Sequence, residues 1–298
     1  MTNASFTLKD TIQQAFALAR DDKPAYRDLF PLLEALFLLQ AEVKGTLEPA
    51  PLEMASQAVA AKWESGFPLL RRWDFPVDIK AATRILQEIR EHIPSGNERM
   101  RLAHEVLSAH LAGHPESAEE VWRSFLQHEM EPWEEWLDTE AVDVPSVLFL
   151  ARSCLRPSVE WTAEDLLRRF PLPKDWLRGY CPTCGSLPAL LFLVGEGERI
   201  AHCSWCGTQW GLQRLQCPYC DNRMHDSLGY MFVEAEPQYR IQHCNQCKTY
   251  FKLIDTRERL YPPFLPLEEW TTLHLDLLAQ RAGWKQPASP SPVVYGEQ

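Results

Sequence analysis

Cys181-Pro-Thr-Cys184 opens a stretch of four Cys-x-x-Cys pairs that continues with Cys203-Ser-Trp-Cys206, Cys217-Pro-Tyr-Cys220 and Cys244-Asn-Gln-Cys247. A Cys-x-x-Cys turn points two thiolates at one ion, and two such turns complete a tetrahedron. One pair alone would be ambiguous, because thiol redox motifs share its spacing. Four pairs within 67 residues predict two metal sites.

The stretch contains an internal repeat. Each copy reads Cys-Pro-x-Cys, a gap, and then His-Cys-x-x-Cys-x-Thr with an aromatic residue two positions later. The gaps of 18 and 23 residues leave room for a β-hairpin in each copy. Because repeated units usually mean repeated structure, each copy should hold one ion. The first site would use Cys181, Cys184, Cys203 and Cys206, and the second Cys217, Cys220, Cys244 and Cys247.

A cross-brace is the alternative arrangement of the four pairs. In it, the first and third pairs hold one ion, and the second and fourth pairs hold the other. The repeat favours two tandem ribbons, and at the level of sequence both arrangements stay open.

Four thiolates suit zinc or a single rubredoxin-type iron, and the two metals share this ligand set and spacing. Full thiolate coordination leaves no open position for a substrate, so a structural role is favoured. The ion would then supply folding free energy to a segment too small to hold itself together. We expect two metal ions, iron or zinc, bound by the eight cysteines.

The residue after the second cysteine of each pair distinguishes the two sites. Gly185 and Gly207 occupy this position in the first site, where glycine helps the turn fold inward. Asp221 and Lys248 replace them in the second site. Asp221 adds negative charge beside four thiolates, whereas Lys248 can offset it. We therefore expect the second site to be less closed and more labile.

Composition narrows the classes of protein to consider. The formal net charge of −11 disfavours a general nucleic-acid-binding protein, whose affinity depends on Lys and Arg neutralising phosphates. A membrane span is not expected, because no run of about 18 apolar residues occurs. Cysteines in metal-site spacing, without a recognisable N-terminal leader, indicate a reducing compartment. We expect a cytoplasmic protein. No phosphate-binding loop, zinc-protease helix or local nucleophile motif is present, which weakens an enzyme interpretation.

The fold class predicted is α+β. An all-helical domain (1–175) should precede a tandem rubredoxin-like or zinc-ribbon module (176–262) and a C-terminal helix with a flexible tail (263–298). Apolar periodicity and stop signals place helices at 29–45, 52–65, 79–92, 98–112, 118–127, 144–155 and 163–170. Asn97 is the expected N-cap of the fourth helix, and Thr162 with Asp165 resembles a capping box.

Strand character begins after Pro171, Pro173 and Gly179, which mark a linker. Alternating and β-branched segments predict strands at 189–194, 199–202, 228–233, 238–242 and 249–254. One helix is expected over 267–281. Among the remaining signals, His202 and His243 are interpreted as strand residues packing on the cysteine turns, and Cys154 as a buried small hydrophobe. The acidic cluster around Trp133 and Trp136 is interpreted as a solvated helix face.

The cysteine stretch closely resembles the family of the formate dehydrogenase accessory protein FdhE. The resemblance is carried by 180–186, by the pairs at 203–206 and 217–220, and by 244–253. The segment Glu269-Trp-Thr-Thr-Leu-His-Leu-Asp-Leu-Leu-Ala279 is similar to the C-terminal helix of that family. The resemblance covers about residues 176–283, whereas the helical part fits the family layout without a specific motif.

The resemblance implies a cytoplasmic, non-catalytic maturation factor. Members of this family act on respiratory formate dehydrogenases, whose catalytic subunit carries a molybdopterin cofactor and folds before export by the twin-arginine route. They contact that subunit, and their rubredoxin-like sites have been associated with iron. On this resemblance the eight cysteines carry over as ligands. Two alternatives stay open: a thiol-redox or electron-transfer protein using its Cys-x-x-Cys pairs, and a zinc-ribbon protein that binds nucleic acid.

Overall fold

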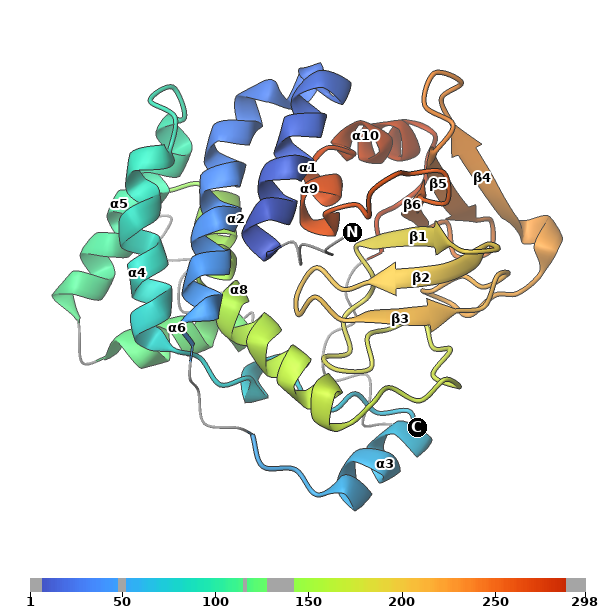
Figure 1. Cartoon of the computed structure of the whole chain (residues 1–298), viewed down its shortest axis with the longest axis horizontal. Helices are drawn as coiled ribbons and strands as arrows, with labels where there is room; N and C mark the ends of the chain where they lie inside the picture. The colour runs from blue at the N-terminus through green and yellow to red at the C-terminus, as the bar shows by residue number, and fades with distance from the viewer. Residues whose placement is uncertain (1–6, 48–51, 115–116, 128–141, 288–298) are drawn as a thin grey trace, which may run out of the picture. The chain divides into compact units, whose positions relative to one another are not determined.

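The computed structural model describes residues 7–47, 52–114, 117–127 and 142–287. Helices make up the first part, a six-stranded sheet follows residue 189, and two helices follow the sheet (Figure 1). Two groups of four cysteines lie in the sheet region. The predicted α+β fold class is therefore confirmed.

The residues form two compact units. The first contains 1–52 and 72–162, and the second contains 53–71 and 163–298. The second unit thus takes in a segment that lies more than a hundred residues before the cysteine stretch. The three-part division expected at residues 175 and 262 stays a prediction.

The first unit is helical throughout its described residues. Its elements are α1 (Leu8–Asp22), η1 (Pro24–Leu29), α2 (Phe30–Gly45), η2 (Arg72–Asp74), α4 (Ile79–Ile89), η3 (Arg90–His92), α5 (Glu98–Gly113), α6 (Ala118–Gln127) and α8 (Val144–Arg169), whose last turns belong to the second unit. The predicted helices at 29–45, 79–92, 98–112 and 118–127 are confirmed, although 90–92 is a 3-10 turn. Asn97 caps α5 as predicted, with Oδ1 accepting from the amide of Met100.

Helix α1 was not predicted from the sequence, although a local signal marks its start. Thr7 Oγ1 accepts from the amide of Asp10 at 3.2 Å, and the Asp10 carboxylate accepts from the amide of Thr7 at 2.9 Å. This reciprocal pair is a capping box. Phe16 of α1 is fully buried, with its ring 5.7 Å from that of Phe30 on α2. The Thr-x-x-Asp spacing could have identified this helix.

The predicted break between 155 and 163 is wrong, because α8 runs continuously through Pro157. Proline has no amide hydrogen, so the carbonyl of Ser153, four residues earlier, loses its helical partner. Gln40 of α2 replaces that partner, since its Nε2 donates to the Ser153 carbonyl at 2.8 Å in a buried position. Thr162 is no cap either: its hydroxyl donates to the carbonyl of Ser158 inside the helix.

The second unit is built on one six-stranded sheet. Its strands are β1 (Leu190–Val194), β2 (Glu198–His202), β3 (Gln209–Leu212), β4 (Leu228–Phe232), β5 (Tyr239–Cys244) and β6 (Tyr250–Asp255), in the order β3-β2-β1-β6-β5-β4 (Figure 1). The five predicted strands are confirmed, whereas β3 was not predicted. Each half of the sheet is an antiparallel three-stranded unit. The halves join through the parallel pair β1 and β6.

Helices α9 (Leu265–Trp270) and α10 (Leu273–Arg281) contribute to the core on one face of this sheet. The single helix predicted over 267–281 is wrong, because the chain breaks at Thr271 and Thr272. Both threonine hydroxyls donate to carbonyls four residues earlier, on Leu267 and Glu268. Such side-chain bonds compete with the backbone ladder. The core under the helices contains Leu190, Phe192, Tyr239, Ile241, Tyr250, Ile254, Leu265, Leu275 and Ala279.

Helix α3 (Ser56–Glu64) and the 3-10 turn η5 (His225–Ser227) complete the second unit. The helix predicted over 52–65 is confirmed with a later start. The acidic cluster around Trp133, and the part of the predicted flexible tail from residue 288 onward, lie outside the described residues. In the described ranges, no helix combines the length and apolar character needed to span a bilayer.

Replacing Gln40 by Met should destabilise the protein by about 1–3 kcal/mol, because the buried Ser153 carbonyl would lose its donor. The measurement is chemical denaturation followed by circular dichroism. In a Pro157→Ala background the loss should be smaller, because the backbone amide that this substitution restores can donate to Ser153. Equal losses in both backgrounds, measured as a double-mutant cycle, would contradict this account of Pro157.

Candidate metal centre

The structure gathers the eight cysteines into two groups of four, each with its sulfurs within 4.8 Å of one another. The first group is Cys181, Cys184, Cys203 and Cys206, and the second is Cys217, Cys220, Cys244 and Cys247. This is the tandem-ribbon arrangement that the repeat favoured, and the cross-brace is not formed. Each group could hold a metal ion.

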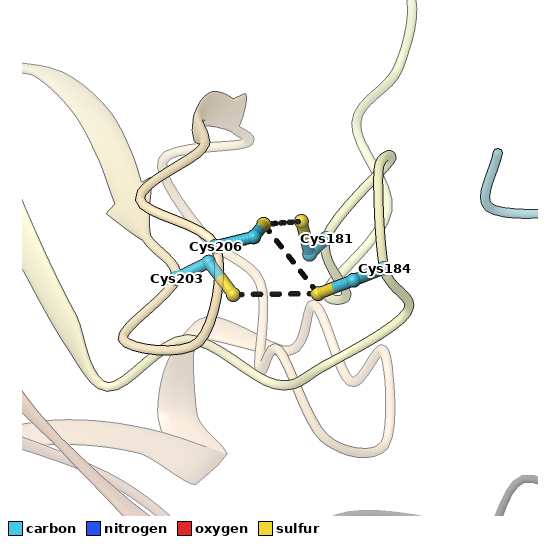
Figure 2. A group of neighbouring side chains, drawn as sticks. All are labelled: Cys181, Cys184, Cys203 and Cys206. Atoms are coloured by element: carbon cyan, nitrogen blue, oxygen red, sulfur yellow. Dashed lines mark hydrogen bonds between the residues drawn. The ribbon is translucent and has the colours of Figure 1, made fainter. Parts of the chain in front are cut away.

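Sulfur separations match those of a tetrahedral site. A metal–sulfur bond of about 2.3 Å in a regular tetrahedron requires sulfurs about 3.8 Å apart. In the first group Cys181–Cys206 and Cys184–Cys206 are 3.6 Å apart and Cys184–Cys203 3.5 Å (Figure 2). In the second group Cys217–Cys247 is 3.6 Å and Cys220–Cys244 3.7 Å. These pairs all join different Cys-x-x-Cys turns, so the four thiols converge on a common centre.

All four Cys-x-x-Cys turns, which we call knuckles, close with the same two backbone hydrogen bonds. The amide of the residue after the second cysteine donates to the carbonyl of the first cysteine, at 2.9–3.0 Å. The amide of the first cysteine donates to the carbonyl five residues later, at 2.8–3.0 Å. Those acceptor residues are Ser186, Thr208, Asn222 and Thr249. The local sequence therefore fixes each knuckle before any metal is considered.

This closure forces a left-handed backbone on the residue after the second cysteine. The φ angle is +75° at Gly185 and +73° at Gly207 in the first site. In the second site it is +57° at Asp221 and +60° at Lys248, the only described non-glycine residues with positive φ. Glycine adopts this region freely, whereas for a residue with a Cβ atom it costs about 1–2 kcal/mol. The second site thus contains backbone strain that the first site avoids.

Polar side chains two residues after a knuckle approach the sulfurs. The hydroxyls of Ser186 and Thr208 lie 3.2 Å from Cys184 and Cys206, and that of Thr249 lies 3.0 Å from Cys247. Asn222 Nδ2 donates to Cys244 at 3.5 Å. Once the thiols are deprotonated, such groups can donate to the sulfurs and offset the negative charge of the site. Sequence reasoning missed Ser186 and Asn222, which occupy the position of the two repeated threonines.

A segment distant in sequence encloses the first knuckle. The amides of Leu69 and Leu70 donate to the carbonyls of Pro182 and Thr183, at 3.0 and 2.9 Å. Trp63 Nε1 of α3 also donates to the Pro182 carbonyl. These contacts are long-range, so the knuckle motif gave no indication of them. All four cysteines of the first site are buried.

The second site is less enclosed. Cys220 and Cys247 are only half-buried, whereas Cys217 and Cys244 are buried. The chain after α10 covers part of the site: the indole of Trp284 stacks on His243 at 4.2 Å, and Lys248 Nζ lies 5.2 Å from the same indole ring centre. This arrangement supports the expectation that the second site is the less closed one.

The negative charge of Asp221 has hydrogen-bonding partners that the sequence did not predict. The Asp221 carboxylate accepts from Arg223 at 3.0 Å and from Gln216 Nε2 at 2.7 Å. Its negative charge beside the sulfurs is therefore partly offset by a neighbouring guanidinium. The sequence interpretation considered only Lys248 for this role.

Burial controls the ionisation of the thiols. It raises the pKa of Cys181 and Cys206 well above the usual range. Burial also acts on Cys203, but hydrogen bonds from Cys181 and Cys184 outweigh it and lower the pKa of that thiol. In the second site burial raises the pKa of Cys217 to about 11. A divalent ion must displace the protons that these thiols retain, so metal binding is coupled to proton release.

The histidines before the second and fourth knuckles do not join either group of sulfurs. His202 is buried in β2, and His243 stacks on Trp284. Cys154 lies in α8 of the first unit and is 2% exposed, as expected for a small hydrophobe. Burial raises the pKa of its thiol.

No family model matches the chain. The chain is 41% identical over 115 residues to the "Protein FdhE homolog" of Aquifex aeolicus, which is 37% of this chain and 40% of that protein. It is 37% identical over 120 residues to the homologue of Haemophilus influenzae strain PittEE, covering 39% of this chain and 38% of the relative. The chain thus spans about two fifths of the length of the curated relatives it matches.

A solved structure is similar over nearly the whole chain. It is the crystal structure of the FdhE protein from Pseudomonas aeruginosa, with a TM-score of 0.65, covering 96% of this chain and 94% of that chain. At 19% identity this similarity shows a common fold alone. Together with the curated relatives, it confirms the resemblance to the FdhE family.

Chelator challenge should release metal in two phases, the second site emptying first. The reason is its half-buried cysteines and its strained knuckle residues. The measurement is the time course of metal transfer to a coloured chelator, repeated with Cys181→Ser and Cys217→Ser proteins to assign each phase. Equal release rates from the two sites would contradict the predicted difference.

The metal-loaded Lys248→Gly protein should be more stable to unfolding than the metal-loaded Lys248→Ala protein. Both substitutions remove the ammonium group and its contact with Trp284, but only glycine relieves the left-handed strain. We expect a difference of about 1 kcal/mol in unfolding free energy, measured by denaturation of the metal-loaded proteins. In the first site, Gly207→Ala should lower the unfolding free energy of the metal-loaded protein relative to the wild type, because it introduces the strain that glycine avoids. If the Lys248→Gly and Lys248→Ala proteins have the same unfolding free energy, backbone strain at residue 248 does not weaken the second site.

Proposed function

From its resemblance to the FdhE family, in sequence over about two fifths of its length and in fold over nearly all of it, we propose that this chain is an accessory protein for the maturation of a formate dehydrogenase. The observation that carries the proposal is the tandem arrangement of two four-cysteine groups in a chain with this resemblance. The proposed client is the molybdopterin-containing catalytic subunit of a respiratory formate dehydrogenase.

The eight cysteines act as ligands to two metal ions in this proposal. The sulfur separations of 3.5–3.7 Å support it, because they suit a four-sulfur tetrahedron. Zinc and iron fit the ligand set equally well. The ions would stabilise the fold of the two ribbons, and the ribbons would form the surface of the second unit that contacts the client.

A non-catalytic, cytoplasmic role follows from the same proposal. Four sulfurs around one ion leave no open coordination position for a substrate. Cysteines without disulfide bonds are the state expected in a reducing compartment. The client subunit would be met there before its export.

The arrangement of sulfurs bears on the two alternative functions. In a dithiol redox motif the two cysteines of one Cys-x-x-Cys pair form the disulfide, whereas here the sulfur pairs at 3.5–3.7 Å join different knuckles. A nucleic-acid-binding ribbon would need a basic surface, and the chain carries a formal charge of −11. Neither alternative has a specific observation in its favour.

An accessory protein of this kind works by differential affinity. It must bind the unfinished client more tightly than the finished enzyme, because a ligand shifts an equilibrium only by the difference in its affinities for the two states. Release on completion would then need no chemical step in this chain.

Replacing both Cys181 and Cys217 by Ser should empty both metal sites and lower formate dehydrogenase activity. The reason is that a tetrahedral site with three thiolates binds its ion less tightly, and the ribbons depend on their ions for folding. Formate dehydrogenase activity is measured in cells whose only copy of the gene encodes the variant. Metal analysis of the purified protein and client transcript levels serve as controls. Cys154→Ser, at a cysteine outside both groups, is the matched control and should change neither quantity. Normal enzyme activity with both sites empty would reject a role for the metals.

A further inference from the structure

Strand β4 ends the sheet with a free edge. It pairs with β5 on one side and, among the described residues, has no strand on the other (Figure 1). The five residues of β4 contain no Lys and no Pro, the residues that commonly block such an edge from pairing with another chain. An unblocked edge strand is therefore a site where an extended segment can add.

The register shows which backbone groups of β4 face outward. The amide of Asn245 donates to the carbonyl of Ser227, just before the strand, at 2.7 Å. Because antiparallel pairs alternate between bonded and non-bonded positions, Gly229 and Met231 bond to β5. The amides and carbonyls of Leu228, Tyr230 and Phe232 then point to the open edge. Within the described residues, no hydrogen bond to the amides or carbonyls of these three residues is found.

Side chains beside this edge are apolar where a solvated strand usually has polar residues. Met231 packs against the core under α9 and α10. Its neighbours Tyr230 and Phe232, on the opposite face, are 45% and 55% exposed, and Val233 is 40% exposed. Burial lowers the pKa of the Arg199 guanidinium on β2, and an interaction with Tyr230 offsets part of that shift. Phe232 and Val233 have no such partner in the described part of the chain.

Carboxylates stand at both ends of the strand. Asp226 lies in η5 directly before β4, and Glu234 follows Val233. Both are exposed, and neither forms an ion pair among the described residues. An apolar edge between two unpaired carboxylates complements a segment that is apolar at alternate positions and cationic at its ends.

We propose that the open edge of β4 is a docking site for an extended segment of a partner protein, with apolar side chains at alternate positions and Arg or Lys at its ends. The segment would add as a seventh strand, bonding to the outward groups of Tyr230 and Phe232 and covering the exposed aromatic rings. On the proposed function, on which this part of the inference rests, the segment belongs to the catalytic subunit of formate dehydrogenase.

A second copy of this chain fits the edge poorly. Antiparallel pairing of two β4 strands centred on Tyr230 would place Asp226 of each copy opposite Glu234 of the other, since both lie four residues from the centre. Like charges directly opposite each other destabilise a strand pair. The same carboxylates therefore disfavour self-association and favour a cationic partner.

The first test uses the metal-loaded full chain and a synthetic peptide of alternating valine and threonine with an arginine at each end. We expect saturable binding, with hydrogen-exchange protection of the Tyr230 and Phe232 amides. The same peptide with glutamate at each end should bind about tenfold more weakly, a difference of about 1.4 kcal/mol. Absence of protection at these amides, or a concentration-dependent dimer that protects them without peptide, would overturn the proposal.

Substitutions on the strand provide the second test. Phe232→Lys places a blocking charge on the edge, and Phe232→Pro removes an outward amide that β5 does not use, a position where an edge strand tolerates proline. Each should weaken peptide binding about tenfold or more. Leu277→Lys alters a side chain of similar exposure, 56%, that lies on helix α10 and not on the strand, and should bind as the wild type does. Metal content and thermal melting show that the variants fold.

The catalytic subunit provides the third test and separates the two proposals. If the wild-type chain binds the subunit and Phe232→Lys binds it equally well, the edge is not the docking site and the proposed function stands. If the wild type binds the peptide at β4 but not the subunit, the proposed function fails and the docking edge stands. Loss of subunit binding in Phe232→Lys alone, with Leu277→Lys unaffected, is the expected result.

Discussion

Closure of the Cys-x-x-Cys knuckle is the constraint on which the second unit depends. Two backbone hydrogen bonds fold each knuckle so that its cysteines point to one side, and two knuckles then bring four sulfurs to within 4.8 Å. The hairpins β1–β2 and β4–β5 are the connections that return the second knuckle of each ribbon to its first. The parallel pairing of β1 with β6 joins the ribbons into one sheet, and α9 and α10 complete the core on that sheet.

The two ribbons share this architecture but differ in how well they satisfy it. The first has glycine at both left-handed positions, and Leu69, Leu70 and Trp63 enclose its leading knuckle. The second places Asp221 and Lys248 at the corresponding positions and leaves two cysteines half-buried. The two copies of the repeated unit therefore form a tightly enclosed group of cysteines and a more accessible one. The accessible site and the open β4 edge both belong to the second ribbon, which makes that ribbon the better candidate for contact with other molecules.

Most local features of the fold could be predicted from short-range patterns. The Asn97 cap, the stop of α2 at Gly45 and the strands on either side of Gly195–Gly197 depend on neighbours within a few residues. Predictions were wrong where a residue distant in sequence supplied a hydrogen bond to the helix, or where side-chain hydroxyls bonded to helix carbonyls. The sequence predicted a break between 155 and 163, but the helix continues through Pro157, where Gln40, more than a hundred residues away in sequence, supplies the missing hydrogen bond. Thr271 and Thr272 interrupt a helix that apolar periodicity alone made continuous.

The sequence by itself determined the eight sulfur positions, their favoured pairing into two groups and the resemblance to the FdhE family. Those features follow from ligand chemistry and from a repeat, both of which are written in residue type and spacing. Only the tertiary structure decided which segment encloses the first site, how the two ribbons join and that β4 lies at an edge of the sheet. These depend on hydrogen bonds and packing between residues far apart in the chain, such as Leu69 with Pro182 and β1 with β6, and no spacing rule encodes them.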